Sequence, residues 1–219
     1  VQSVGTVNGN SLISIAKDQG LNQLVVCGGS VATLIPQIVG DSLTLTEEDV
    51  IDLIKVTSTE VVLLKDETAF QQQTAGVVDT ILNRVKSEHW GKTVRDVANA
   101  YRQFSKITGP KILKPYGSVQ NMPLKDIHEK TKQYVKQYLK ERSAGRKSIV
   151  GNNLNYANKY VSDDYNRRVW VNVFHDEVLK TGLIFGSGKS IHAHGTTSDL
   201  MKYRPKEFTV ILPSNFDSI

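Results

Sequence analysis

Cysteine is almost absent from this sequence, since Cys27 is the only one among 219 residues. A single thiol excludes a disulfide scaffold and a cysteine-based zinc ribbon. No apolar run approaches the roughly 18 residues of a membrane span, and no basic, apolar, small-residue signal peptide opens the chain. The hydrophobic fraction of 39% and the charged fraction of 22% suit a globular protein with a core. The length suits one mid-sized domain plus a small module.

Motifs of several enzyme classes are also missing. Residues Gly186 to Ser190 (G-S-G-K-S) resemble the end of a phosphate-binding loop, but position 183, where that loop requires glycine, is Leu183. The following residues do not have the pattern of a helix either. No G-x-S-x-G nucleophile elbow and no H-E-x-x-H zinc motif occur in the sequence. We therefore expect neither a nucleotide nor another cofactor.

Negative charge is the scarcer sign: the formal net charge is +5 and the pI is about 9.2. This excess suits a polyanionic partner such as nucleic acid, an anionic surface or a bacterial wall. The basic residues concentrate between Lys106 and Lys147. No RRM, zinc-finger or basic-zipper pattern accompanies them, so we expect no nucleic-acid partner.

Glu60 is the most informative residue that is present. From Thr46 to Leu64 the apolar residues recur at helical spacing, and Thr46 followed by Asp49 indicates a helix N-cap. Glu60 follows Leu53 by about two turns and should project from nearly the same apolar face. A carboxyl held against apolar surroundings has a raised pKa and can donate a proton near neutral pH. The alternative is a boundary glutamate paired with a nearby Lys or Arg.

The rest of the chain after residue 46 reads as helices followed by short strands. Thr68 with Gln71 has the pattern of a capping box that opens the next helix. Helices are expected over 68–85, 94–101 and 124–142, a loop over 107–121, and strands over 170–174, 182–185 and 208–212.

Residues 1–45 carry little charge, so we predict a domain boundary after residue 45. The segment Val7–Leu12 leads into Ile15-Ala16, and the segment closes with Ile38–Leu45 (I-V-G-D-S-L-T-L). These residues resemble the LysM module, a small βααβ unit with a G-D-T-L-x-x-I-A start and an I-x-G-x-x-L-x-I finish. LysM modules bind N-acetylglucosamine polymers, so the resemblance implies binding to the cell wall.

A second constellation spans residues 48–197. It consists of the Glu60 helix, Leu82-Asn83-Arg84-Val85, Gln103-Phe104-Ser105, Asn153 to Asn158, and Ile191 to His194. In order and spacing these residues resemble the SleB-like cell-wall hydrolases, the family of spore-cortex-lytic enzymes that also occurs in phages. Here Ser58-Thr59-Glu60 replaces the family's A-E-A-R-G-E stretch, and Gly195-Thr196 replaces the aromatic end of its final N-H-x-F-Y strand.

The resemblance implies an α+β fold over residues 46–219, in which a mainly α, lysozyme-like or lytic-transglycosylase-like domain carries a small β-sheet. It implies cleavage of the glycosidic bond between N-acetylmuramic acid and N-acetylglucosamine in peptidoglycan, with Glu60 as the single acid and base and no metal. The residues that it assigns to substrate binding are Arg84, Gln103, Phe104, Ser105, Tyr156, Asn158 and His194.

Three alternatives remain at this point. Glu67 or Asp66 could be the acid in place of Glu60, or could supply a second carboxylate for a hydrolytic glycosidase. His192 and His194 alternate as on a strand and, with the upstream pair His175-Asp176, could serve a zinc-dependent or other peptidase of stem peptides. The third is a non-catalytic wall-binding or virion structural protein. The missing leader, the small size and the basic charge favour a phage protein located in the virion or in the host periplasm and wall, with peptidoglycan and other virion proteins as partners.

Overall fold

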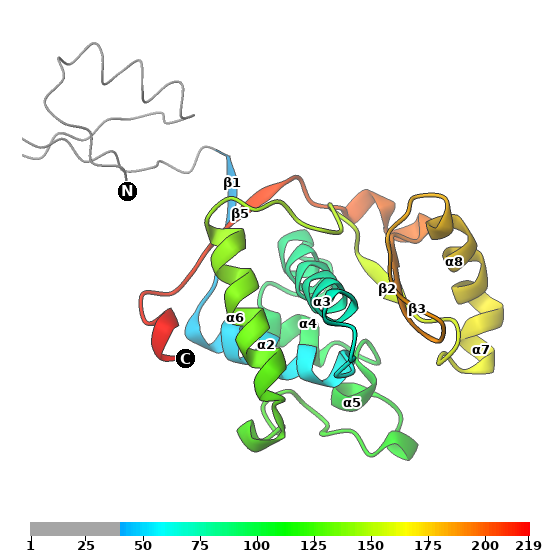
Figure 1. Ribbon diagram of the computed structural model, residues 1–219, viewed down its shortest axis with the longest axis horizontal. Helices are drawn as coiled ribbons and strands as arrows, with labels where there is room; N and C mark the ends of the chain where they lie inside the picture. Colours follow the sequence, from blue (N-terminus) through cyan, green and yellow to red (C-terminus); the bar gives the residue numbers. More distant parts are fainter. Residues whose placement is uncertain (1–39) are drawn as a thin grey trace, which may run out of the picture. The chain divides into compact units, whose positions relative to one another are not determined.

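The computed structural model describes residues 40–219, in which helices predominate and the strands are short (Figure 1). None of the helices in this part is long and apolar enough to cross a membrane. The α-helices are α2 (Glu47–Glu60), α3 (Glu67–Ser87), α4 (Val94–Asn99), α5 (Ser105–Thr108), α6 (Glu129–Ser143), α7 (Asp164–Asn166) and α8 (Asn172–Leu179). The strands are β1 (Asp41–Thr44), β2 (Asn155–Ala157), β3 (Ile184–Ser187), β4 (Ser190–Gly195) and β5 (Phe208–Ile211). Five short helical segments complete the order: η1 (Lys111–Leu113), η2 (Leu124–Asp126), η3 (Arg167–Val171), η4 (Ser198–Tyr203) and η5 (Phe216–Ser218).

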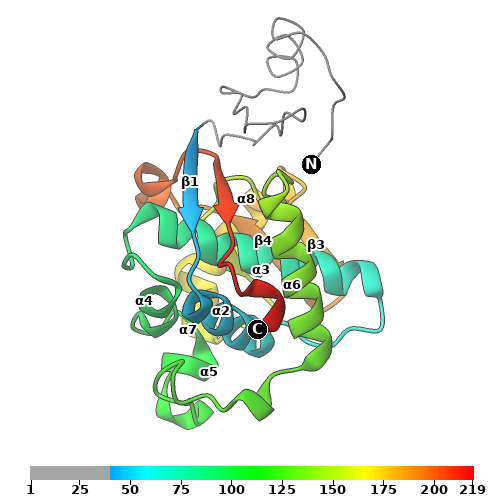
Figure 2. The ribbon, with the colours of Figure 1, turned by 90° about the vertical axis from the view of Figure 1, so that its left-hand side faces the viewer.

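The 21-residue helix α3 is the centre of the fold. It packs against α2, α4 and α6 and also against all three strands β2, β3 and β4 (Figures 1 and 2). Asp66 caps its start by accepting a hydrogen bond from the Ala69 N–H at 3.1 Å, and Glu88 ends it in the left-handed conformation. Because α3 is covered on several sides, it buries polar as well as apolar residues. Its side chains can therefore reach both the helices and the sheet.

Helix α2 forms where the sequence predicted it. Thr46 and Asp49 make the reciprocal hydrogen bonds of a capping box, and acidic residues fill the first turn. Leu53 and Ile54 are buried in the main core. The helix ends at Glu60, after which Val61 adopts extended backbone. The predicted carboxylate therefore lies at the C-terminal end of α2, in the last turn.

The strands form two small sheets. Strands β1 and β5 pair with each other, and Leu45 N–H donates to Ile211 O at 2.9 Å just beyond this pair. The other sheet has the order β2-β4-β3 and is antiparallel throughout. Its register sets Tyr156 opposite His194 and Phe185 opposite His192. An α+β architecture that is mainly helical with little sheet is thus confirmed.

Three expectations about elements were wrong in part. Residues 170–174 (W-V-N-V-F) are helical rather than a strand, because Val171, Phe174 and Val178 share one face that packs against β4. The helix expected from residue 124 begins at Glu129, and Leu124 is 65% exposed in a separate short turn. The start of α3 is capped by Asp66, and Thr68 lies inside its first turn.

The LysM-like segment falls almost wholly outside the described residues. Its closing residues Asp41–Thr44 form β1. The compact unit that contains α2 to α8 begins at Leu43. The module itself and the boundary after residue 45 stay predictions.

Candidate active site

Glu60 lies against two groups brought from distant parts of the chain. The Tyr156 hydroxyl, in β2, donates a hydrogen bond to Glu60 Oε2 at 2.5 Å. The Thr59 hydroxyl, which donates to Val56 O at 2.8 Å, lies 3.5 Å from the other carboxyl oxygen. The guanidinium of Arg84, in α3, is close enough to act on the carboxyl through its charge. Helices α2 and α3 and strand β2 therefore converge on one carboxyl group.

Burial raises the pKa of Glu60 above the usual value for glutamate, although Tyr156, Arg84 and Thr59 each lower it. Burial and the neighbouring carboxyl raise the pKa of Tyr156 well above its usual value, so its hydroxyl stays protonated and remains a donor. A raised pKa keeps a larger fraction of Glu60 protonated near neutral pH than an exposed glutamate would be. The site thus holds a carboxyl suited to proton transfer.

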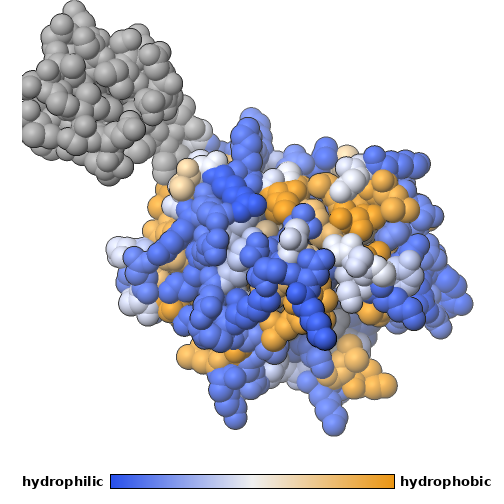
Figure 3. Space-filling model, viewed as in Figure 1, coloured by the Kyte–Doolittle hydropathy of each residue, from blue (hydrophilic) through white to orange (hydrophobic). Residues whose placement is uncertain are grey.

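A groove of about 770 Å³ runs beside this group. Tyr156 and Arg84, which both act on Glu60, line this groove, whereas Glu60 lies behind them and is not itself a lining residue. One wall comes from the segment that includes α8, and on that side of the molecule Figure 3 shows apolar patches among hydrophilic surface. The lining residues are Arg84, His89, Trp90, Arg102, Gln103, Asn155, Tyr156, Asn166, Val169, Trp170, Val173, Phe174, Glu177, Thr197, Ser198, Asp199 and Leu200.

The adjacent α3 residues Asn83 and Arg84 hold the loop that leads into β2. Asn83 Nδ2 donates to Gly151 O and Asn153 O, both at 2.9 Å, and Arg84 Nε donates to Leu154 O at 2.8 Å. These bonds fix the chain just before Tyr156. Asn83 and Arg84, which belong to the Leu82–Val85 part of the family resemblance, therefore position the partner of Glu60.

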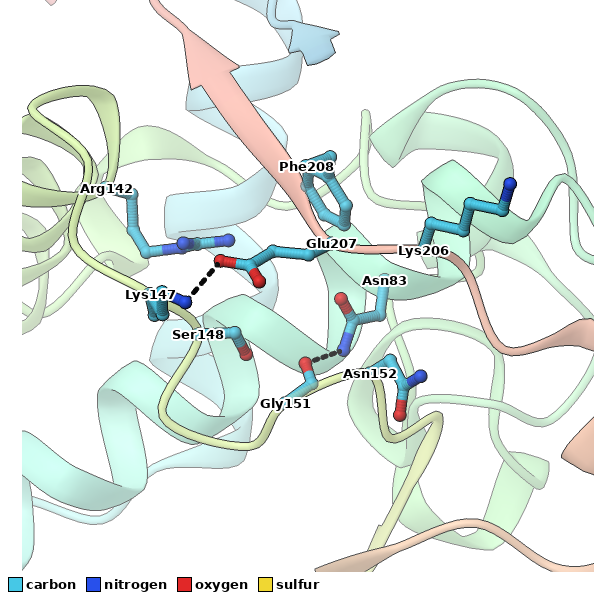
Figure 4. Close-up of a pocket in the computed structure, with 9 residues that line it drawn as sticks. All are labelled: Asn83, Arg142, Lys147, Ser148, Gly151, Asn152, Lys206, Glu207 and Phe208. Carbon is cyan, nitrogen blue, oxygen red and sulfur yellow. Dashed lines mark hydrogen bonds and ion pairs between the residues drawn. The ribbon is translucent and has the colours of Figure 1, made fainter. Parts of the chain in front are cut away.

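A separate cavity of about 290 Å³ lies beside Asn83, on the side of residues 147–152 and 206–208 (Figure 4). Lys147 pairs with Glu207 at 3.4 Å near it, and the Asn83 amide is directed to the Gly151 carbonyl. Neither Glu60 nor Tyr156 lines this cavity. We therefore place the candidate active site in the larger groove.

Tyr156 packs against two histidine rings. His192 and His194 point to the same side of β4, and the centroid of each ring is 5.4 Å from that of Tyr156, at interplanar angles of 25° and 29°. His194 is fully buried and lies 3.2 Å, Nδ1 to Oγ1, from Thr80. Burial lowers the pKa of His192 to about 4 and the pKa of His194 well below its usual value, so both rings are neutral near pH 7. The geometry gives these rings a packing role beneath Tyr156.

Helix α3 approaches His194 at Gly76, which leads to a stability prediction. A Cβ at position 76 would lie 2.7 Å from His194 Nε2 and 3.3 Å from Phe185 Cε2. Alanine favours the helix by about 1 kcal/mol, but overpacking a rigid site costs about 1–3 kcal/mol. We expect Gly76→Ala to lower the free energy of unfolding and the Tm, measured by denaturant and thermal melts.

The His194→Ala background is the control for this prediction. Removing the ring makes room for the new methyl group, so the cost of Gly76→Ala should disappear there, as a double-mutant cycle would reveal. A Gly76→Ala protein more stable than the wild type would contradict the close contact between α3 and β4.

The other residues predicted for substrate binding divide into two groups. Gln103 lines the groove, and its Oε1 accepts a hydrogen bond from Arg84 Nη1 at 3.2 Å. Phe104 is buried in the main core, and Ser105 is exposed at the start of α5. Asn158 follows β2, where its side chain bonds Lys189 O and Tyr160 N. The structure thus brings Arg84, Gln103 and Tyr156 to the groove, with Glu60 bonded to Tyr156 behind it, while Phe104, Ser105, Asn158 and His194 do not line the groove.

The alternative acids have other partners. The Asp66 side chain caps α3. Glu67 is exposed and pairs with Lys130 at 2.7 Å, which holds the pKa of Glu67 below its usual range. The carboxylates that line the groove are Glu177 and Asp199. Glu60 bonds the groove residue Tyr156, whereas the partners of Asp66 and Glu67 are Ala69, Gln71 and Lys130, which lie outside the groove. Within residues 40–219, no group of three or more His, Cys, Asp or Glu side chains is placed to hold a metal ion.

Both tryptophans of the chain line the groove, and the sequence did not reveal this. Trp90 lies under the Arg84 guanidinium, 4.7 Å from its Cζ, and Trp170 packs edge-on to Phe174. The sequence pattern predicts a strand at Trp170 and gives no role to Trp90. The sequence did offer one indication that these residues bind a ligand: they are the only two tryptophans of the chain, and each lies next to a loop. Aromatic side chains are common in binding sites.

Comparison with protein families gives a match for the part of the chain that contains most of the groove residues. A family model described as Cell Wall Hydrolase matches residues 70–178. The matched segment includes Arg84, Gln103 and Tyr156, while Glu60 precedes it and His194 follows it. No curated protein and no solved structure gave a significant match. The family match therefore supports the assignment of residues 70–178 to the cell wall hydrolases, and with it an enzyme that cleaves peptidoglycan.

Proposed function

We propose that this protein cleaves the glycosidic bond between N-acetylmuramic acid and N-acetylglucosamine, with Glu60 as the only acid and base. The observation that carries the proposal is the partly buried Glu60 carboxyl, bonded to the Tyr156 hydroxyl at 2.5 Å beside a groove of about 770 Å³. The cell wall hydrolase match supports the substrate. Glycosidic cleavage requires a proton for the leaving oxygen, and a carboxyl with a raised pKa supplies one.

In the proposed reaction, protonated Glu60 gives its proton to the glycosidic oxygen as the C–O bond breaks. The resulting carboxylate then removes the proton from the 6-hydroxyl of the muramyl residue, whose oxygen bonds to C1. The product is a 1,6-anhydro sugar, and no water is consumed. One carboxyl suffices for both steps. Glu60, whose carboxyl is bonded to the Tyr156 hydroxyl, can therefore act without a second acid. The indole rings of Trp90 and Trp170 offer flat surfaces for sugar rings.

Mass spectrometry of digested peptidoglycan tests the proposal directly. Anhydromuropeptides are the expected products. Reducing muropeptides would instead indicate hydrolysis by water, free peptides would indicate a peptidase, and the absence of products would indicate a non-catalytic wall-binding protein. Each of the last three results contradicts the lytic transglycosylase reaction.

Removing the Tyr156 hydroxyl should change the pH dependence of activity. The hydroxyl stabilises the charged form of Glu60 and so lowers its pKa, against the larger effect of burial. In Tyr156→Phe this pKa should rise, and the protonated donor should persist to higher pH. We expect the basic limb of the kcat/KM profile to move upward by about one pH unit, the usual size for a hydrogen bond to a charged group.

Tyr160→Phe is the matched control, since Tyr160 is exposed and is not among the groove residues. Its basic limb should coincide with that of the wild type. A limb for Tyr156→Phe that stays in place or moves to lower pH would contradict the role of the hydroxyl on Glu60.

A further inference from the structure

Two arginines line the groove, but only one of them is committed to protein partners. Arg84 is 5% exposed, bonds Leu154 O and Gln103 Oε1, and lies over Trp90. Arg102 is exposed at the groove wall next to Gln103. Within residues 40–219 the contact recorded for its guanidinium is the ring of Tyr101, 5.2 Å from Cζ, and none of the ion pairs involves it. The groove therefore presents one guanidinium that is free to bind a ligand.

The backbone at Arg102 makes this residue type unexpected. Its φ is 56°, in the left-handed region that favours glycine. Gln103 N–H donates to Ala100 O at 3.2 Å, so Arg102 occupies the third position of a turn, where positive φ normally selects glycine. Glu88 and Lys114 also have positive φ, but each ends a helix, where this conformation is ordinary. Arg102 has no such reason.

The remaining polar groups show which ligand suits this wall. Glu177 and Asp199 are the carboxylates that line the groove, and within residues 40–219 neither forms an ion pair with Arg102. The unpaired guanidinium of Arg102 therefore attracts an anionic part of the substrate. Guanidinium groups bind carboxylates through paired, charge-assisted hydrogen bonds. In peptidoglycan the carboxylates belong to the stem peptides and, where the peptide is missing, to the lactyl group of the muramyl residue.

We propose that Arg102 forms a carboxylate-binding subsite at the rim of the groove, and that it takes a stem-peptide carboxylate. This inference rests on the proposed function for the identity of the substrate. It makes Arg102 a specificity-determining residue: peptide-bearing strands with free carboxyl groups bind better than strands whose carboxyl groups are amidated.

The test compares the wild type with Arg102→Gly on soluble strands of both kinds. Glycine is compatible with φ 56°, so the variant should fold, with a Tm equal to or above that of the wild type. We expect kcat/KM on free-carboxyl strands to fall about tenfold, the effect of one charge-assisted hydrogen bond, and to change less than about twofold on amidated strands. Equal losses on both strands, or an unchanged preference in Arg102→Gly, would overturn the proposal.

Lys106→Ala is the matched control for charge. Lys106 is exposed on α5, four residues further along the chain, and does not line the groove. This variant also loses one positive charge, so a general electrostatic effect would weaken the preference for free carboxylates here as well. That result would overturn a specific site at Arg102, and an unchanged preference would support it.

Binding separates this proposal from the proposed cleavage. The Glu60→Gln protein, with and without Arg102→Gly, can be titrated calorimetrically with both kinds of strand. If the wild type cleaves neither strand, the cleavage reaction is wrong, but an Arg102-dependent preference in binding still supports the subsite. Peptide-free strands, which keep only the lactyl carboxylate, identify the source. Arg102-dependent binding to these strands, equal to that for peptide-bearing ones, would overturn the assignment to the stem peptide.

Discussion

Glu60→Gln should lower kcat/KM for peptidoglycan strands by at least about 100-fold, because general acid catalysis typically contributes 10²- to 10⁴-fold. Glutamine has nearly the same shape, and its amide oxygen can still accept the hydrogen bond from the Tyr156 hydroxyl. It cannot donate and recover the proton that the reaction requires. Because burial disfavours the charged form of Glu60, the neutral variant should be at least as stable as the wild type, as thermal melts would show.

Glu67→Gln is the control for this substitution. Glu67 was the alternative acid, and the structure places it outside the groove in an exposed pair with Lys130. Its replacement should leave turnover close to that of the wild type. If Glu60→Gln keeps activity within about tenfold while Glu67→Gln loses it, the acid has been assigned to the wrong residue.

The position of Glu60 was predictable because its signals are local. A capping box at Thr46 and the repeat of Val50, Leu53 and Ile54 fix where α2 begins and which face is buried. Its chemical partner was not predictable by the same reasoning. Tyr156 lies 96 residues away and reaches Glu60 only because β2 pairs with β4 and both pack on α3. The family resemblance indicated Tyr156 as a substrate-binding residue. Only the structure revealed that its hydroxyl bonds the Glu60 carboxyl.

The strand predicted over residues 170–174 was wrong because of tertiary packing. The run from Trp170 to Phe174 is rich in β-branched and aromatic residues, which favour strands locally. The spacing of Val171, Phe174 and Val178 instead gives a helix a continuous apolar face, and β4 covers that face. The family resemblance assigns His194 to substrate binding. In the structure the strand that carries His194 packs against Gly76 of α3, and the histidine side chain is buried there. Sequence patterns do not indicate which elements of the fold will cover a given residue.

Local sequence patterns also gave no indication of a buried ion pair between two helices. Asp79, in α3, lies 3.0 Å from Arg142 Nε of α6, and both side chains are less than 5% exposed. The other Asp79 oxygen accepts the Tyr138 hydroxyl at 2.5 Å and the Ile149 N–H at 2.8 Å. One carboxylate therefore connects two helices with the loop that runs on to β2 and Tyr156.

Asp79→Ala should destabilise the protein by about 3–5 kcal/mol, because it leaves a buried guanidinium without its counter-charge. It also leaves the Tyr138 hydroxyl and the Ile149 N–H without their acceptor, so the loop before β2 should loosen and activity should fall with stability. Denaturant unfolding measures the loss in the free energy of unfolding.

Asp217→Ala is the control for this substitution. Asp217 forms an exposed ion pair at 2.6 Å with Lys140, which lies in α6 like Arg142, and exposed pairs contribute little to stability. A loss for Asp79→Ala no larger than that for Asp217→Ala would contradict a structural role for the buried pair.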